Sequence, residues 1–155
     1  MRDKGRIFAQ AVIKVKEIVD GQGHRDDKLM AICLLLRDDV SHYHWVGFYL
    51  VDEDGKNLLL GPYVGQPTRH VKIPFGQGVC GLAAEEKRTI MVPDVSKILN
   101  YLSCSPQVKS EMVVPIFKDG HMVGELDIDS HTAAPFTEED KDFLEDVCRE
   151  VVKLF

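Results

Sequence analysis

YLSCSPQVKSEMVVPIFKDGHMVGELDIDS, residues 101–130, sets the architecture of this chain. Within it, two alternating apolar runs, residues 111–118 and 121–129, flank the dipeptide Asp119-Gly120. An Asp-Gly pair between two such runs is a strong signal for a type I′ β-hairpin. We therefore predict two antiparallel strands joined by a two-residue turn.

The second strand of this hairpin carries a row of acidic residues. Residues two apart in a strand point the same way, so Glu125, Asp127 and Asp129 share a face, with neighbours about 6.5–7 Å apart. Glu111 begins the first strand, and the tight turn is expected to place it near Asp129. Crowded carboxyl groups resist simultaneous ionisation, so one of them should keep its proton toward neutral pH. The alternative is a solvated acidic strand face without a joint role.

A single cysteine, Cys104, precedes the hairpin in the polar segment SCSP. It lies in a long connection that is predicted to have little regular structure, and such loops in compact domains usually have a function. A thiol in a polar loop is a candidate nucleophile, and an inert loop cysteine is the alternative. A thiol beside a carboxyl group that keeps its proton suits a reaction with an oxyanion leaving group.

The other three cysteines differ in their surroundings. Cys33 and Cys148 lie on apolar helical stripes and are predicted to be core residues. Cys80 belongs to GQGVCG, residues 76–81, which opens a short helix. This turn lacks the third glycine of GxGxxG and the lysine of a P-loop, so nucleotide binding is not expected. The helix dipole would favour a Cys80 thiolate, and a buried structural cysteine is the alternative.

Helical periodicity appears at both ends of the chain. Amphipathic patterns predict helices over residues 6–19 and 25–37. A third helix is expected to begin after Thr137, a good N-cap, with Asp140 three positions on completing a capping box.

Between these helices the apolar pattern is that of β-strands. Six short strands are predicted, over residues 44–51, 57–60, 69–73, 89–92, 111–118 and 121–129. A loop is expected to start at Gly61-Pro62. Together the elements predict one α+β domain over residues 1–155, with a mostly antiparallel sheet of about six strands. The N- and C-terminal helices are expected to pack on one face of the sheet, with a ligand pocket on the other.

Composition excludes several classes of protein. The 155 residues carry a formal net charge of −6 without a basic stripe, which argues against nucleic-acid binding. The longest apolar runs, such as residues 31–36, are too short to span a membrane. The start, MRDKGRIF, lacks the apolar run of a signal peptide, so a cytoplasmic protein is expected. No metal site is expected, because the chain has neither CxxC spacing nor a tight aspartate-rich cation loop.

Five segments together resemble one known family, the free methionine-(R)-sulfoxide reductases, which are small enzymes made of a single GAF domain. The segments are WVGFYL (45–50), IPFGQGVCG (73–81), the SC pair at Cys104, SEMVVP (110–115) and GELDIDS (124–130). The resemblance covers residues 40–155. It implies a GAF fold over the single domain and reduction of the R epimer of free methionine sulfoxide, rather than of protein-bound residues.

The resemblance also implies a set of site residues. Cys104 matches the catalytic cysteine and Cys80 the cysteine of the GVCG motif. Members commonly carry a further cysteine at the position of His70, so either Cys80 or an external thiol is left to resolve an oxidised Cys104. Glu125 stands where the family more often has an apolar residue and is left out of the site.

The remaining matches concern the walls of the pocket. Glu111, Asp127 and Asp129 match the polar site, whereas Trp45 and Tyr49 match aromatic residues that line it. The last two are equally well interpreted as plain core aromatics.

The resemblance implies no bound cofactor, with thioredoxin or another thiol as reductant, and a possible homodimer. The sequence leaves two other functions open: a non-catalytic GAF module that binds a small ligand, and a thiol redox sensor.

Overall fold

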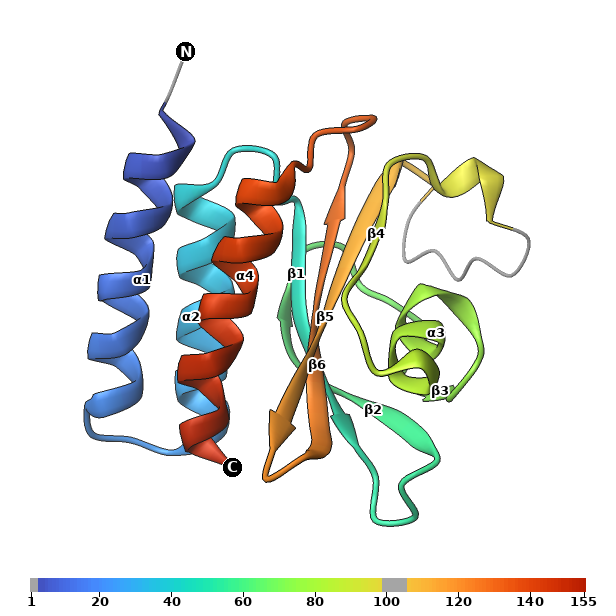
Figure 1. Cartoon of the computed structure of the whole chain (residues 1–155), viewed down its shortest axis with the longest axis horizontal. Coiled ribbons are helices and arrows are strands. Elements are labelled where there is room, and N and C mark those ends of the chain that lie inside the picture. Colours follow the sequence, from blue (N-terminus) through green and yellow to red (C-terminus); the bar gives the residue numbers. More distant parts are fainter. Residues whose placement is uncertain (1–2, 99–105) are drawn as a thin grey trace.

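The computed structural model describes residues 3–98 and 106–155, which form a layered α+β structure (Figure 1). Six antiparallel strands make one sheet in the order β3-β2-β1-β6-β5-β4. The long helices α1, α2 and α4 lie on one side of this sheet, and the short helix α3 lies on the other. The predicted fold class and the packing of the terminal helices on one face are therefore confirmed.

The helices are α1 (Lys4–Asp20), α2 (Arg25–Asp39), α3 (Gly78–Glu86) and α4 (Glu138–Val151), with short 3₁₀ turns at Val95–Lys97 and Val152–Leu154. The strands are β1 (Trp45–Val51), β2 (Asn57–Val64), β3 (Lys72–Pro74), β4 (Ile90–Val92), β5 (Ser110–Lys118) and β6 (His121–Ser130). Within the described residues, no helix is long and apolar enough to cross a membrane.

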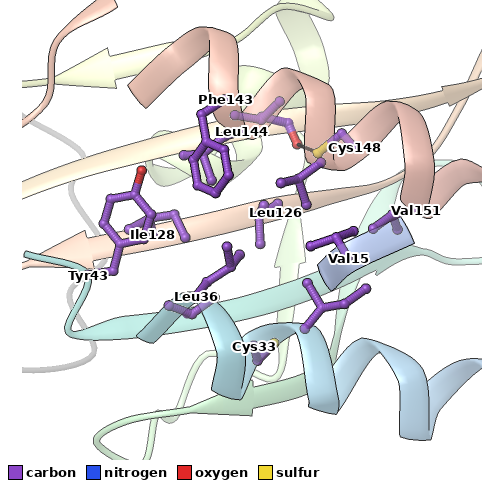
Figure 2. Packing of buried hydrophobic residues seen from close by; sticks show 14 of the residues in the cluster. Val15, Cys33, Leu36, Tyr43, Leu126, Ile128, Phe143, Leu144, Cys148 and Val151 are labelled. Carbon is purple, nitrogen blue, oxygen red and sulfur yellow. Dashed lines mark hydrogen bonds between the residues drawn. The ribbon is translucent and has the colours of Figure 1, made fainter. Parts of the chain in front are cut away.

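The main apolar core lies between the sheet and the long helices (Figure 2). Helices α2 and α4 contact the sheet directly, and α1 packs across both of them. Phe8 of α1 stacks on Phe143 of α4 with ring centroids 4.2 Å apart. Cys33 and Cys148 are buried in this core, as predicted.

A buried carboxylate ties the ends of three segments together at one end of this layer. Asp140 is fully buried and closes the predicted capping box by accepting a hydrogen bond from the Thr137 amide at 3.0 Å. It also contacts Lys4 Nζ at 2.6 Å, His42 Nε2 at 2.6 Å and the Tyr43 hydroxyl at 2.9 Å. Although burial by itself acts to raise it, these partners hold the pKa of Asp140 well below its usual range.

The β5–β6 hairpin has the predicted type I′ turn. Both central residues have positive φ, 52° at Asp119 and 80° at Gly120, as this turn requires. Lys118 pairs with His121 directly across it.

The hairpin also contains a β-bulge that the sequence analysis did not predict. Phe117 pairs with Met122, but the next residue, Ile116, pairs with Gly124. Val123 is therefore an extra residue on β6 without a partner on β5.

This bulge decides which side chains of β5 face the acids of β6. With Val123 as an extra residue, Glu111 pairs with Asp129. If β6 had no extra residue, the register of the turn would pair Glu111 with Ile128, whose side chain lies in the helix-side core. The predicted neighbourhood of Glu111 and Asp129 is confirmed, but the turn alone does not produce it.

Two predicted boundaries were wrong. The loop expected at Gly61-Pro62 is part of β2, which continues to Val64. At this point Phe48 of β1 faces two residues instead of one, because Gly47 pairs with Tyr63 and Tyr49 with Leu60. A proline is tolerated at such a bulge because no ladder hydrogen bond needs its missing N–H. Strand β3 also starts later than predicted, at Lys72, and pairs only with the first part of β2.

The bulge predicts a specific requirement for glycine at position 124. A Cβ on Gly124 would lie 2.6 Å from the Tyr49 carbonyl oxygen, a backbone atom that cannot move without disturbing β1. We expect Gly124→Ala to lower the free energy of unfolding by about 1–3 kcal/mol, measured by urea denaturation. Gly5→Ala, which adds the same methyl group to α1 at 3.4 Å from its nearest atom, is the control and should leave stability unchanged or raise it by up to about 1 kcal/mol, because alanine favours a helix more than glycine does. Equal midpoints for Gly124→Ala and the wild type would contradict the close approach at the bulge.

Candidate active site

Four carboxyl side chains lie on the sheet face that turns away from the long helices. Glu111 comes from β5, and Glu125, Asp127 and Asp129 come from successive same-side positions of β6. None of the four is more than 4 % exposed. The predicted common face is therefore confirmed, and the alternative of a solvated acidic face is wrong.

Strand β1 brings two aromatic residues beside these acids. Trp45 pairs with Asp129, and Tyr49, four residues further along β1, pairs with Glu125. Their rings stack at a centroid distance of 6.4 Å. Each ring donates a hydrogen bond to the loop before β3: Trp45 Nε1 to the Gln66 carbonyl at 3.0 Å, and the Tyr49 hydroxyl to the His70 carbonyl at 2.9 Å. The two aromatics thus fix this loop as one wall.

Between these two aromatics, Gly47 leaves room above Asp127, with which it pairs. A Cβ at Gly47 would lie 2.5 Å from the Trp45 ring. The indole therefore folds over a position where only glycine fits, next to the Asp127 carboxyl group.

Helix α3 supplies the opposite wall and the thiol. Positive φ at Gly76 in the preceding turn, 93°, and at Gly78, the first residue of α3, 65°, brings the start of the helix against the sheet. Cys80 in the first turn of α3 is 5 % exposed, and its Sγ donates to Glu111 Oε2 at 3.8 Å. This contact joins the thiol to the acids.

These walls surround a narrow, partly open pocket with a cavity volume of about 10 Å³, roughly enough for one water molecule. It is lined by Trp45, Tyr49, Thr68, His70, Ile73, Gln77, Gly78, Val79, Cys80, Glu111, Asp127 and Asp129. The pocket thus lies on the predicted face of the sheet and brings together every site residue proposed from the sequence that the structure describes. Cys104 lies outside the described residues.

Burial favours the protonated forms of Glu111 and Asp127 in this pocket. Desolvation raises the pKa of Glu111 well above its usual range, and the charges of Asp127 and Asp129 raise it further. Desolvation also raises the pKa of Asp127, although hydrogen bonds with Glu111 and Cys80 oppose that effect. The prediction that clustered carboxyl groups retain a proton is consistent with these directions.

The predicted effect of the helix dipole on Cys80 was wrong. Burial raises the pKa of the Cys80 thiol well above its usual range, and the neighbouring charges, led by Asp127 and Glu125, raise it further. Desolvation and like charge outweigh the dipole because Cys80 faces four acids at close range. In the state described, Cys80 is a buried neutral thiol.

Glu125 lies behind the pocket without lining it. Its side chain is fully buried, and within the described part of the chain neither carboxyl oxygen has a hydrogen-bond partner. Burial, followed by the charge of Asp127, raises its pKa well above the usual range, although the nearby Cys80 thiol opposes this effect. Glu125 was not among the predicted site residues, although strict alternation from Asp127 places it on this face.

Sequence reasoning missed three polar residues of the wall. Thr68 and His70 come from the loop before β3, and Gln77 comes from the turn before α3. Their only sequence signal was position, next to glycine- and proline-rich turns. His70, seen only as a departure from the family pattern, lines the pocket together with Cys80.

The profile of the GAF domain family matches residues 24–153. The free methionine-R-sulfoxide reductase of Saccharomyces cerevisiae is 42% identical over 157 residues, covering 97% of this chain and 87% of that protein. The free methionine-R-sulfoxide reductase of Escherichia coli is 34% identical, covering 77% of this chain and 71% of that protein.

A solved structure agrees with these relatives. The X-ray structure of free methionine-R-sulfoxide reductase from Neisseria meningitidis, in complex with its substrate, superposes with a TM-score of 0.93 at 34% identity, covering 100% of this chain and 92% of that one. The chain therefore belongs to the GAF domain family and, within it, to the free methionine-R-sulfoxide reductases.

Glu125 predicts an unusual dependence of stability on pH. Its folded pKa lies above that of an unfolded glutamate, about 4.3, so ionising it opposes folding, and the penalty grows as the pH rises above that value. Glu125→Met should therefore raise the free energy of unfolding, by about 1–3 kcal/mol at pH 8 and by less at pH 5. Urea denaturation at both pH values, in buffer with EDTA, measures this.

Glu17→Met, which changes an exposed glutamate of α1 in the same way, is the matched control. It should shift stability by less than about 0.5 kcal/mol at either pH. A destabilised Glu125→Met protein, or a gain that is larger at pH 5, would contradict the buried protonated carboxyl.

Proposed function

We propose that this protein reduces free methionine-(R)-sulfoxide to methionine by thiol chemistry. The observation that carries the proposal is the close match, over the whole chain, to a free methionine-R-sulfoxide reductase solved with its substrate. The pocket of buried acids, aromatic rings and a thiol is chemically suited to that substrate.

The proposed substrate has three parts, and the pocket offers a partner for each. The ammonium group would be attracted to an ionised carboxylate among Glu111, Asp127 and Asp129. The thioether end would contact the rings of Trp45 and Tyr49, where a sulfur–aromatic contact contributes up to about 1.5 kcal/mol. A methionine sulfoxide within a peptide lacks the free ammonium group and needs more space, which favours the free amino acid.

In the first chemical step, the Cys104 thiolate attacks the sulfoxide sulfur. A carboxyl group of Glu111, Asp127 or Asp129 supplies the proton that the oxygen requires. The methionine sulfur is reduced to the thioether, and Cys104 is oxidised to a sulfenic acid.

A second thiol then condenses with the sulfenic acid, which forms a disulfide and releases water. Cys80 is the candidate within the molecule, since Cys33 and Cys148 lie in the core on the other face of the sheet. Cys80 is buried beside Glu111, and a direct bridge requires its Cβ and that of Cys104 to approach to about 4.5 Å or less. An external thiol is the alternative.

An external dithiol completes the proposed cycle by reducing the disulfide. Thioredoxin is the reductant that we propose, and a homodimer is the proposed assembly. No bound cofactor is needed, because the protein thiols carry the electrons in each step.

The test is NADPH consumption coupled through thioredoxin and thioredoxin reductase, with free methionine-(R)-sulfoxide as substrate. We expect turnover by the wild type and at least a 1,000-fold lower kcat/KM for Cys104→Ser, roughly the scale for loss of a nucleophile. Cys33→Ser is the matched control, a cysteine on the opposite side of the sheet, and should keep its activity. The S epimer should not be reduced.

Two outcomes would overturn parts of this proposal. Tight binding of the sulfoxide without turnover would assign the protein to the ligand-binding or redox-sensing GAF modules instead. Activity that survives Cys104→Ser would exclude that residue as the nucleophile. Mass spectrometry after a single turnover then decides the second thiol, because it shows either a Cys80–Cys104 disulfide or a persistent sulfenic acid.

A further inference from the structure

Three buried side chains of the pocket bring ligand atoms unusually close together. Cys80 Sγ and one carboxyl oxygen each of Glu111 and Asp127 all lie within 4.8 Å of one another. They come from three different elements, α3, β5 and β6, so the grouping is a product of the tertiary fold. All three side chains are at least 95 % buried.

The spacing of these atoms resembles that around a bound transition-metal ion. Zn–S and Zn–O bonds of about 2.3 and 2.1 Å at the tetrahedral angle place sulfur and oxygen about 3.6 Å apart. Cys80 Sγ and Glu111 Oε2 are 3.8 Å apart. Little movement is therefore needed for these two atoms to hold one ion.

An unpaired carboxyl oxygen in the same cluster independently points to a cation as the ligand. Asp127 lines the pocket, is 4 % exposed, and its Oδ1 has no hydrogen-bond partner in the described residues. In the same residues, no ion pair joins Glu111, Glu125 or Asp127 to a basic side chain. Buried acids without a cationic partner are costly, and a bound dication would relieve this cost.

We propose that Cys80, Glu111 and Asp127 form a binding site for a divalent transition-metal ion of the Zn²⁺ class. The thiolate ligand selects this class, because Mg²⁺ and Ca²⁺ take oxygen ligands almost exclusively. Asp129 or water supplies the fourth position of the tetrahedron, and the protons of the Cys80 thiol and of the Glu111 and Asp127 carboxyl groups are released to the buffer as the ion binds. This proposal replaces the expectation, drawn from the sequence, that the chain has no metal site.

The same cluster belongs to the proposed methionine sulfoxide pocket, so the ion and the substrate compete for it. An ion held by Glu111 and Asp127 removes the carboxylates available to the substrate ammonium group, and it ties up Cys80. Zinc is therefore expected to be a reversible inhibitor of the reductase, competitive with the sulfoxide. This consequence rests on the proposed function, but binding of the ion itself does not.

The test measures metal binding directly, on reduced protein without substrate. Titration with Co²⁺ should give one site per chain and a cysteine-to-cobalt charge-transfer absorption, and Zn²⁺ should displace the cobalt. Cys80→Ser should abolish the charge-transfer band and weaken Zn²⁺ binding by roughly 100-fold or more in calorimetry. Asp127→Asn should weaken binding but keep the band. Mg²⁺ should show no binding.

Three cysteine variants are the controls. Cys33→Ala and Cys148→Ala change buried core thiols, and Cys104→Ser changes the remaining one; all three should keep the band. Circular dichroism checks that every variant is folded. A band that is lost with Cys104→Ser but kept with Cys80→Ser, or Zn²⁺ binding that is equal in wild type and Cys80→Ser, would overturn the proposal.

Inhibition kinetics separate this proposal from the proposed function. Metal binding without any sulfoxide reduction would leave the site standing and refute the reductase. Sulfoxide reduction without saturable Zn²⁺ binding would refute the metal site and leave the reductase standing. If both hold, Zn²⁺ should raise the apparent KM for methionine sulfoxide and leave kcat unchanged, and EDTA should reverse this.

Discussion

The extra residue at Val123 is the constraint on which the rest of this site depends. A strand exposes alternate residues to opposite faces, so one unpaired residue moves the remainder of the β5–β6 ladder by a full face. Because of it, Glu111 lies beside Asp129 on the pocket side, and the neighbouring apolar residues of β5 fill the helix-side core. Gly124 follows directly and allows the close approach of the Tyr49 carbonyl. The bulge thus places the apolar residues of β5 in the core and Glu111 beside the acids of β6.

The two faces of the sheet have opposite roles. The helix side is continuously apolar and is covered by long helices, which stabilises the fold through burial (Figures 1 and 2). The other face buries four acids that a purely structural sheet would replace by apolar side chains. Burying Glu111, Glu125 and Asp127 opposes folding at neutral pH, because burial raises their pKa values above those of the unfolded chain. Such a cost is typical of functional sites, where reactivity is set by environment.

Local patterns predicted much of this structure, and long-range geometry supplied the rest. The Asp119-Gly120 turn, the shared face of the acids and the core position of Cys33 all follow from spacing along a single element. The bulge at Val123 does not, because it is decided by how β6 fits β1 and β5 at the same time. Burial of Cys80 likewise depends on how α3 packs on the sheet, so the sequence suggested a dipole effect that desolvation overrides.

The position of the substrate can be seen in a crystal structure of the reduced Cys104→Ser variant with free methionine-(R)-sulfoxide. We expect the ligand between α3 and the acidic face of the sheet, with its ammonium group within hydrogen-bond distance of Glu111, Asp127 or Asp129 and its methyl end against Trp45. Ligand bound elsewhere, for example in the groove between α4 and β5, with this pocket unchanged, would show that the acidic face is not the substrate site.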